Sequence, residues 1–119
     1  MPSTRGLGAR SPIGLRFIRP IIETLQKTPG NKLHKDDLKN AIVKDYEIPA
    51  REAGHEMMSG RNEILHDMGW ARSSLVKAGL LRRPHETKKG VWELTSLGIK
   101  TQMDDTAAEH LYRTNKPYR

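Results

Sequence analysis

At residues 69–98 the chain reads GWARSSLVKAGLLRRPHETKKGVWELTSLG, and this segment sets the architecture that we expect for the whole protein. Its first part completes an apolar-periodic helix that ends at Gly79, a residue type that commonly follows a helix. Two short extended runs, residues 80–81 and 91–94, then flank a polar and basic turn, and Thr95 is suited to cap another helix. The order of helix, basic hairpin and helix is typical of the end of a winged-helix domain.

The long helix is expected to run from residue 62 to residue 78. At about 100° per residue, its apolar side chains fall within one narrow arc, formed by Ile64, Met68, Ala71 and Leu75. The opposite face carries Asn62, Glu63, His66, Trp70, Ser73 and Lys77. Gly69 lies in the middle of the helix, where glycine costs about 1 kcal/mol relative to alanine. It therefore indicates a close approach to the backbone, either by another helix or by a ligand.

The segment before the long helix predicts two further helices and a short strand. Apolar residues at i, i+3, i+4 and i+7 predict a first helix that starts near Arg19, with Pro20 in its first turn and Phe17 packing from the entering segment. Leu33 is expected in a short extended segment, and a second helix is expected over residues 35–46.

Other elements complete the expected fold, which is α+β and mostly α, with a two-stranded wing and a C-terminal helix. Residues 50–58 are expected to form one or two helical turns, with Met57 and Met58 facing inward. The last helix, which starts at Thr95, is expected either to form a homodimer or to pack back on the first helix through Leu97, Met103, Ala107 and Leu111. The domain organisation that follows is a flexible basic arm at 1–14, a winged-helix domain at 15–112 and a tail at 113–119.

The charge distribution favours a nucleic-acid partner. The formal net charge is +7 over 119 residues, which favours an anionic partner, with nucleic acid ahead of a membrane surface. Residues 71–100 hold seven basic and two acidic residues, a net of +5, and residues 1–20 hold four basic and no acidic residues. Residues 51–70 hold two basic and four acidic residues, a net of −2. The positive excess therefore lies in the arm and in the helix and hairpin, where a winged helix would contact phosphates; the alternative is an ordinary solvated surface.

Several other classes of protein are excluded or disfavoured. The absence of cysteine excludes disulfides, thiolate zinc sites and cysteine nucleophiles, and it fits a cytosolic protein. Together with the expected DNA partner and the resemblance given below, the predicted location is the prokaryotic cytoplasm, in association with the nucleoid. No apolar run approaches the roughly 18 residues of a membrane span, and the N-terminus lacks the apolar core of a signal peptide. The five histidines lack the spacing of a metal site, so we predict neither a metal nor another cofactor.

The chain resembles the N-terminal domain of Mrr-type restriction system proteins. The resemblance covers roughly residues 17–100 and rests on PII at 20–22, SGR at 59–61, GWAR at 69–72, AGL at 78–80, and GVWELTSLG at 90–98. It implies a winged-helix DNA-binding domain that serves as the specificity module of restriction enzymes that respond to modified DNA. Full-length members add a nuclease domain, so the resemblance also implies a nuclease domain or subunit as a partner.

The candidate site residues follow from double-stranded DNA binding by the long helix and the wing. The first half of the helix is expected to enter the major groove, where arginine suits guanine and asparagine suits adenine. The candidate base readers are Arg61, Asn62 and His66. The candidate phosphate contacts are Ser73, Lys77, Arg82, Arg83, Lys88 and Lys89.

The two tryptophans have different expected roles. Trp92, on a wing strand, is expected to pack against the long helix. Trp70 is expected either to cover the junction of helix and hairpin, with its N–H bonded, or to form an apolar surface that senses a methyl group in the major groove.

Three other functions are alternatives to this interpretation. A magnesium-dependent nuclease needs Glu-x-Lys on a strand with a partner acid; Glu86-Thr87-Lys88 matches the tripeptide but lies in the hairpin, so we predict no enzymatic activity. Within DNA binding, the alternative to a restriction module is a small stand-alone transcriptional regulator. A winged helix that contacts protein or RNA is a further alternative, supported by the acidic residues 51–70.

Overall fold

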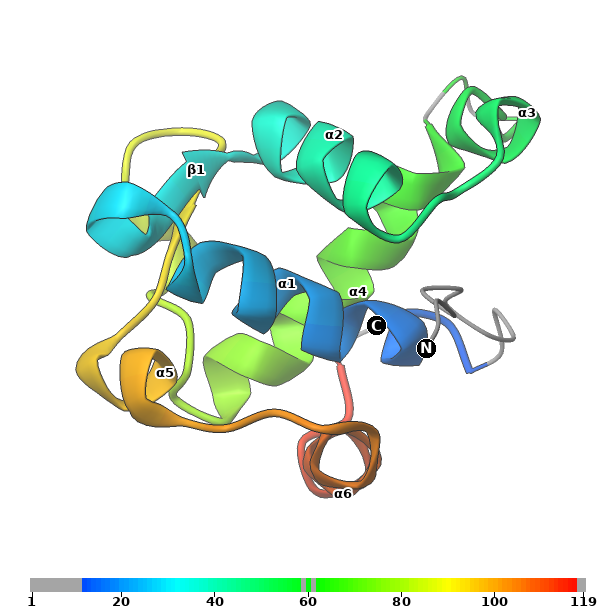
Figure 1. The fold of residues 1–119 in the computed structure, drawn as a ribbon. Helices are drawn as coiled ribbons and strands as arrows, with labels where there is room; N and C mark the ends of the chain where they lie inside the picture. Colours follow the sequence, from blue (N-terminus) through cyan, green and yellow to red (C-terminus); the bar gives the residue numbers. More distant parts are fainter. Residues whose placement is uncertain (1–11, 59, 61, 118–119) are drawn as a thin grey trace.

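The computed structural model describes residues 12–58, 60 and 62–117 (Figure 1). Within these ranges the protein is mostly helical, with one two-stranded antiparallel sheet, and it has the predicted winged-helix-like α+β fold. In chain order the elements are η1 (Leu15–Phe17), α1 (Ile18–Gln26), η2 (Pro29–Asn31), β1 (Lys32–His34), α2 (Lys35–Asp45), α3 (Ala50–Ala53), α4 (Glu63–Lys77), η3 (Pro84–Glu86), β2 (Val91–Glu93), α5 (Ser96–Lys100) and α6 (Asp105–Thr114), where η marks a 3-10 turn.

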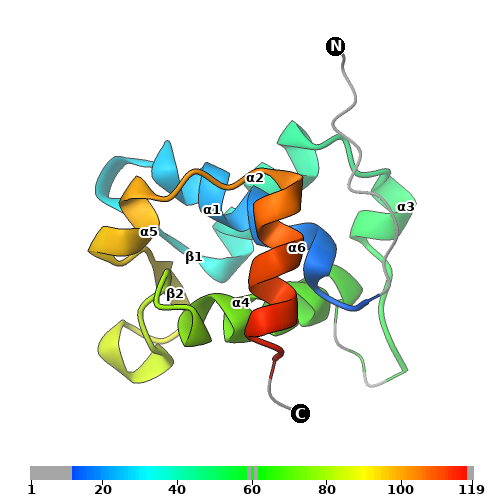
Figure 2. The same ribbon diagram turned by 90° about the horizontal axis from the view of Figure 1, so that it is seen from below.

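Helix α1 forms the centre of the core, and α2, α4, α5 and α6 all pack against it (Figures 1 and 2). Five side chains at its start and along its length have no exposed surface: Phe17, Ile18, Ile21, Ile22 and Leu25. Burial of each such side chain stabilises the fold by roughly 1.5–3 kcal/mol. The predicted packing of Phe17 from the entering segment is confirmed, because Phe17 lies in η1 immediately before α1.

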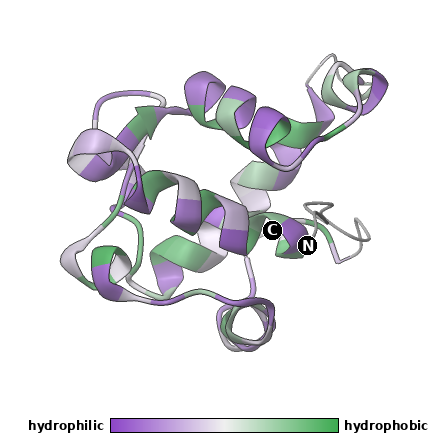
Figure 3. Ribbon diagram, viewed as in Figure 1, coloured by the Kyte–Doolittle hydropathy of each residue, from purple (hydrophilic) through white to green (hydrophobic). Residues whose placement is uncertain are grey.

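Helices α2 and α4 match the predicted ranges closely. Figure 3 shows hydrophobic and hydrophilic residues alternating along these helices, as expected for elements that bury one face. The predicted inward face of α4 is confirmed, since Ile64, Met68, Ala71 and Leu75 are fully buried. The same face also buries Asp67 and Ser74, which the apolar pattern did not indicate.

The strand pairing differs from the predicted hairpin. Strand β2 pairs mainly with β1, in a register that places Leu33 opposite Trp92. The expected partner, residues 80–81, contributes only the bridge between Leu81 and Leu94, followed by a bond from Arg82 N to Glu93 O at 2.9 Å. Pro84 then starts η3 and has no N–H to donate to a ladder. The predicted strand at Leu33 is confirmed, and it supplies most of the pairing that we had assigned to the hairpin.

The predicted last helix is divided into α5 and α6. Thr95 caps α5 as expected, but the chain is extended from Thr101 to Asp104, whose carboxylate accepts a bond from Ala107 N at 2.7 Å and caps α6. Met103 is buried, whereas Leu97 is 55% exposed, so these residues do not share one face. Figure 2 shows α6 lying over α1 and α4, so its apolar face is covered by its own chain, the second of the two arrangements expected.

Two other expectations need correction. Met58 was expected to face inward, but it is fully exposed, because helix α3 ends at Ala53 and does not carry Met58 on a helical face. Residues 1–11 of the expected flexible arm, which was predicted over residues 1–14, lie outside the described residues. Its last part is described, and there Ile13 is partly buried and Gly14 is buried. The Tyr112 hydroxyl donates to Ile13 O at 2.6 Å, and Gly14 lies against the backbone of α4.

Gly98 provides a test of the packing between α5 and the segment after α4. A Cβ at residue 98 would overlap the carbonyl oxygen of Leu80, which is held in place because it accepts a bond from Thr95 N at 3.0 Å. We expect Gly98→Ala to lower the free energy of unfolding by about 2–3 kcal/mol. The melting temperature, followed by circular dichroism, should fall by roughly 10 °C or more.

The matched control is Gly54→Ala, since a Cβ at residue 54 would make only an ordinary contact of 3.6 Å with Ala50 O. Its melting temperature should stay close to that of the wild type. Equal melting temperatures for the two variants would contradict the packing described for α5.

Candidate nucleic-acid interface

The side of α4 that borders the wing, here called its outward face, is made of small or apolar residues. It consists of Leu65, Gly69, Ser73 and Val76; Gly69 is exposed, whereas Leu65 and Val76 are partly buried and pack against the core. The polar side that carries His66 and Lys77 lies next to it. Charged side chains on α4 lie at the margins of this strip, where Arg72 is on one side and Lys77 is at the C-terminal end. The centre of the helix therefore presents a shallow surface that a flat ligand can approach closely.

The wing, defined as residues 82–90, presents the basic side chains next to this strip. Its exposed members are Arg82, Arg83, His85, Lys88 and Lys89. The Glu86 carboxylate accepts a bond from Arg83 N at 2.9 Å and Thr87 Oγ1 donates to Val91 O at 2.8 Å, so bonds within the wing define its shape. Among the predicted phosphate contacts, the structure brings Lys77 and Arg83 together around one open pocket, which also includes Val76, Pro84 and His85.

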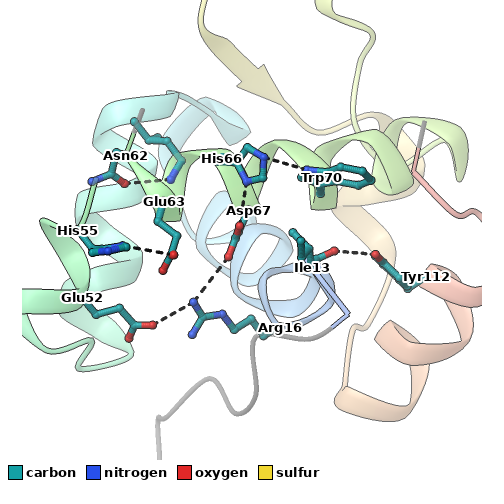
Figure 4. Close-up of polar contacts among 11 residues, drawn as sticks. Ile13, Arg16, Glu52, His55, Asn62, Glu63, His66, Asp67, Trp70 and Tyr112 are labelled. Atoms are coloured by element: carbon teal, nitrogen blue, oxygen red, sulfur yellow. Dashed lines mark hydrogen bonds and ion pairs between the residues drawn. The ribbon is translucent and has the colours of Figure 1, made fainter. Parts of the chain in front are cut away.

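A chain of polar contacts crosses the first half of α4 (Figure 4). Trp70 Nε1 donates to His66 Nε2 at 3.3 Å, so the other ring nitrogen, Nδ1, carries the proton that it donates to Asp67 Oδ1 at 3.1 Å. The Asp67 side chain is fully buried, and its second oxygen lies 3.8 Å from the Arg16 guanidinium. Arg16 in turn donates to Glu52 at 3.1 Å. The chain links α4 to the N-terminal segment and to α3.

Two of the three predicted base readers, Asn62 and His66, use their polar atoms in hydrogen bonds to other groups of the protein. Both ring nitrogens of His66 have protein partners. Asn62 caps α4, accepting from Leu65 N at 3.1 Å and donating to Ala53 O at 2.8 Å, while Arg61 lies outside the described residues. The base-reading role of these three residues stays a prediction.

Trp70 is half-buried with its N–H bonded, as one of the two expectations required. Its surroundings differ from that expectation. A Cβ on Gly14 would come within 2.8 Å of Trp70 Cβ and 2.9 Å of Ala71 N, so the N-terminal segment, rather than the hairpin, covers the base of this side chain. Gly14 has φ of 93°, which favours glycine.

Trp92 contacts Arg72, a residue of the candidate interface that was not among the predicted site residues. Trp92 is 4% exposed, and the Arg72 guanidinium lies 4.8 Å from its ring centroid, which confirms that Trp92 packs against the long helix. Burial lowers the pKa of Arg72. A signal was available in the sequence, because Arg72 lies between the buried and exposed arcs of α4 and its long side chain can reach a strand beside the helix.

Arg72 also lines a pocket of about 270 Å³ on the outward face of α4, together with Gly69, Ser73, Val76 and Pro84. Nearly all of the surface inside this pocket is apolar. It lies between the middle of α4 and the start of the wing, beside the basic pocket around Lys77.

Other chemistry finds little support in the described part of the chain. Glu86 belongs to a 3-10 turn and uses its carboxylate to cap that turn, so the Glu86-Thr87-Lys88 tripeptide lacks the strand setting of a nuclease. No three histidine or acidic side chains among the described residues gather as a metal site. None of the helices described combines the length and apolar character needed to cross a membrane.

The fold and this surface define the chain as a winged-helix-like domain with a basic wing beside an open helix face. The model of one protein family, described as the Mrr N-terminal domain, matches residues 15–103, so the chain belongs to the Mrr N-terminal domain family. This is a domain associated with restriction systems. The match begins at η1 and ends just before α6. Comparison with curated proteins and with solved structures gave no match.

The buried carboxylate of Asp67 provides a test of the polar chain. Removing one member of a buried charge pair typically costs about 3–5 kcal/mol. Because Glu52 still contacts Arg16, we expect Asp67→Ala to lower the free energy of unfolding by an amount near the lower end, about 3 kcal/mol. Urea unfolding followed by tryptophan fluorescence measures the loss.

Asp105→Ala is the matched control, because Asp105 pairs with Arg19 at 3.3 Å on the surface, where ion pairs contribute little. We expect its unfolding midpoint to stay near that of the wild type. Equal losses in the two variants would show that Asp67 does not hold the N-terminal segment against α4.

Proposed function

We propose that the protein binds double-stranded DNA through the outward face of α4 and the basic wing. The observation that carries this proposal is the placement of exposed basic side chains beside an uncharged helix face that the chain leaves open. The 15 residues of α4 span about 22 Å, and a major groove about 12 Å wide admits such a helix. The net charge of +7 suits a polyanion.

The distribution of charge favours docking through the second half of α4. Glu52, Glu56 and Glu63 surround the helix N-terminus, and phosphates close to them would be repelled. Lys77 and the wing lie at the other end, where they can neutralise phosphates on the groove edge. We therefore centre the interface on residues 69–77, with Arg82, Arg83, Lys88 and Lys89 as backbone contacts.

Within DNA binding, we propose that the protein acts as the specificity module of a restriction system, with recognition of modified bases as the finer hypothesis. Family membership supports the association with restriction. The partner would be a nuclease domain or subunit. A stand-alone transcriptional regulator is the alternative. A long last helix that forms a homodimer would support it, but the apolar face of α6 is covered by α1 and α4, which weakens that support.

The rival function, contact with a protein or RNA, draws on one specific observation. The acidic end of α4 borders an open pocket lined by Pro49, Arg51, Glu52, His55 and Glu63, on the side away from the wing. This surface repels a polyanion, RNA included, so the observation supports contact with a basic protein and not with RNA. Absence of duplex binding at low salt would favour this rival.

The wing lysines provide the test of DNA binding. Because each phosphate contact contributes about 0.9 to the slope of log affinity against log salt, we expect the double variant Lys88→Ala with Lys89→Ala to flatten that slope by about two units. Affinity should fall on all sequences alike, since phosphate contacts carry no sequence information. Fluorescence anisotropy with a labelled duplex across a salt series measures both effects.

The control removes the same charge elsewhere, through Lys100→Ala with Arg113→Ala on α5 and α6. Both side chains are exposed, and neither helix forms part of the proposed interface. We expect its slope to change by much less than two units. A wing variant that behaves like this control would show that the wing does not contact DNA.

Modified duplexes separate the restriction module from the regulator. We expect duplexes with 5-methylcytosine or N6-methyladenine to bind more tightly than the unmodified duplex of the same sequence if the protein recognises modified bases. Equal affinity for all three would remove the modification hypothesis and leave DNA binding intact. Incubation of the same duplexes with Mg²⁺ tests enzymatic activity, and cleavage that is lost in Glu86→Ala would contradict a purely binding role.

A further inference from the structure

Gly69 is a glycine that the fold itself does not require. It lies inside α4 with ordinary helical geometry, where glycine weakens a helix relative to alanine. A Cβ at residue 69 would meet no atom within 4 Å, whereas a Cβ at Gly14 or Gly98 would collide with neighbouring atoms. The helix therefore gives up stability for a reason that lies outside the described part of the chain, at an exposed point of its outward face.

The space above Gly69 is the apolar pocket described above. Gly69 and Val76 supply its α4 side and Pro84 supplies its wing side. A side chain at residue 69 would stand at the edge of this pocket, because Gly69 itself lines it. The pocket thus offers apolar walls to a group that approaches the helix backbone closely.

Arg72 adds a second, polar requirement to the same pocket. Within the described chain it makes no hydrogen bond or ion pair, and its Nε is buried without a partner, although its guanidinium lies over the Trp92 ring. A guanidinium can only donate hydrogen bonds, and a half-buried charged group gains from an acceptor. The group that best fits this pocket therefore carries an apolar atom next to a hydrogen-bond acceptor.

The surroundings of the pocket indicate what carries such a group. Lys77 and Arg83 line the adjoining pocket, which shares Val76 and Pro84 with this one, so the ligand belongs to a polyanion. In the major groove of duplex DNA, thymine presents a C5-methyl group beside its O4 acceptor. Cytosine and 5-methylcytosine present an N4 amino donor at the position of O4, which does not suit Arg72.

We propose that the pocket at Gly69 receives the major-groove edge of a thymine, with the methyl group against Val76 and Pro84 and O4 facing Arg72. This inference rests on the proposed binding of duplex DNA. Gly69 acts as a positioning residue, since the absence of a side chain lets the base edge reach the pocket.

The test compares one mixed-sequence duplex with the same duplex in which deoxyuridine replaces every thymine, so that only methyl groups are lost. Wild-type protein should bind the uracil duplex about fourfold more weakly for each contacted thymine, the effect of removing one buried methyl group. Addition of 5-methylcytosine to both duplexes should leave the ratio of thymine to uracil affinity unchanged, because its amino group does not suit Arg72. Anisotropy at one fixed salt concentration measures all four duplexes.

Gly69→Ala separates a binding role from a structural one. We expect its melting temperature to rise by about 4–8 °C, because alanine favours the helix and meets no atom. Its affinity for the thymine duplex should nevertheless fall, and its ratio of thymine to uracil affinity should approach one. Val76→Ala, which shortens one wall of the pocket, should lower the same ratio.

The double variant Lys88→Ala with Lys89→Ala is the control, because loss of phosphate contacts should weaken both duplexes equally and keep the ratio. Equal wild-type affinity for the thymine and uracil duplexes would overturn the thymine assignment and leave DNA binding standing. A ratio of thymine to uracil affinity that approaches one when 5-methylcytosine is added to both duplexes would overturn the role of Arg72 in choosing the base. Absence of binding to either duplex at low salt would overturn the proposed function, and the thymine site with it.

Discussion

The position of the outward helix face depends on one buried carboxylate. Asp67 lies on the inward side of α4 with no exposed surface, between the protonated nitrogen of His66 and the guanidinium of Arg16. A charge buried in this way is tolerated only with partners. His66 belongs to α4 itself, whereas Arg16 comes from the segment before α1 and also donates to Glu52 on α3. The carboxylate therefore fixes the rotation of α4 relative to the N-terminal segment, and that rotation determines which residues face outward.

The sequence predicted the helices that bury one regular face and missed the contacts that join distant segments. Apolar spacing located α1, α2 and α4, because an amphipathic helix carries its own pattern. The predicted partner of β2, residues 80–81, was wrong because three-residue strands carry almost no sequence pattern. The pairing between β1 and β2 depends instead on packing across the core. The division between α5 and α6 was missed although Asp104 is a good cap, because the apolar spacing of Leu97 and Met103 outweighed that local signal.

The candidate site was less predictable than the fold for a related reason. A helical wheel separates inward from outward residues, but it does not show that the polar atoms of Asn62 and His66 form hydrogen bonds with other groups of the protein. Asp67 was not selected from the sequence, although it lies four residues before Ala71 and therefore beside the apolar arc. Arg72 entered only as part of a family signature. Side chains that act through contacts across the chain, such as Arg72 over Trp92, become visible only when the strand and the helix are placed together.

The two halves of α4 are therefore suited to different tasks. In the first half, His66, Asp67 and Trp70 join the helix to the N-terminal segment, and acidic neighbours keep polyanions away. In the second half, the outward strip is small and uncharged, and basic residues stand beside it. Gly69 lies at the boundary between these halves, where local helix propensity is sacrificed without any gain in packing. A conflict of this kind between local preference and the fold is expected where function imposes its own requirement, so the boundary marks where the anchored part of α4 ends and the binding surface that we propose begins.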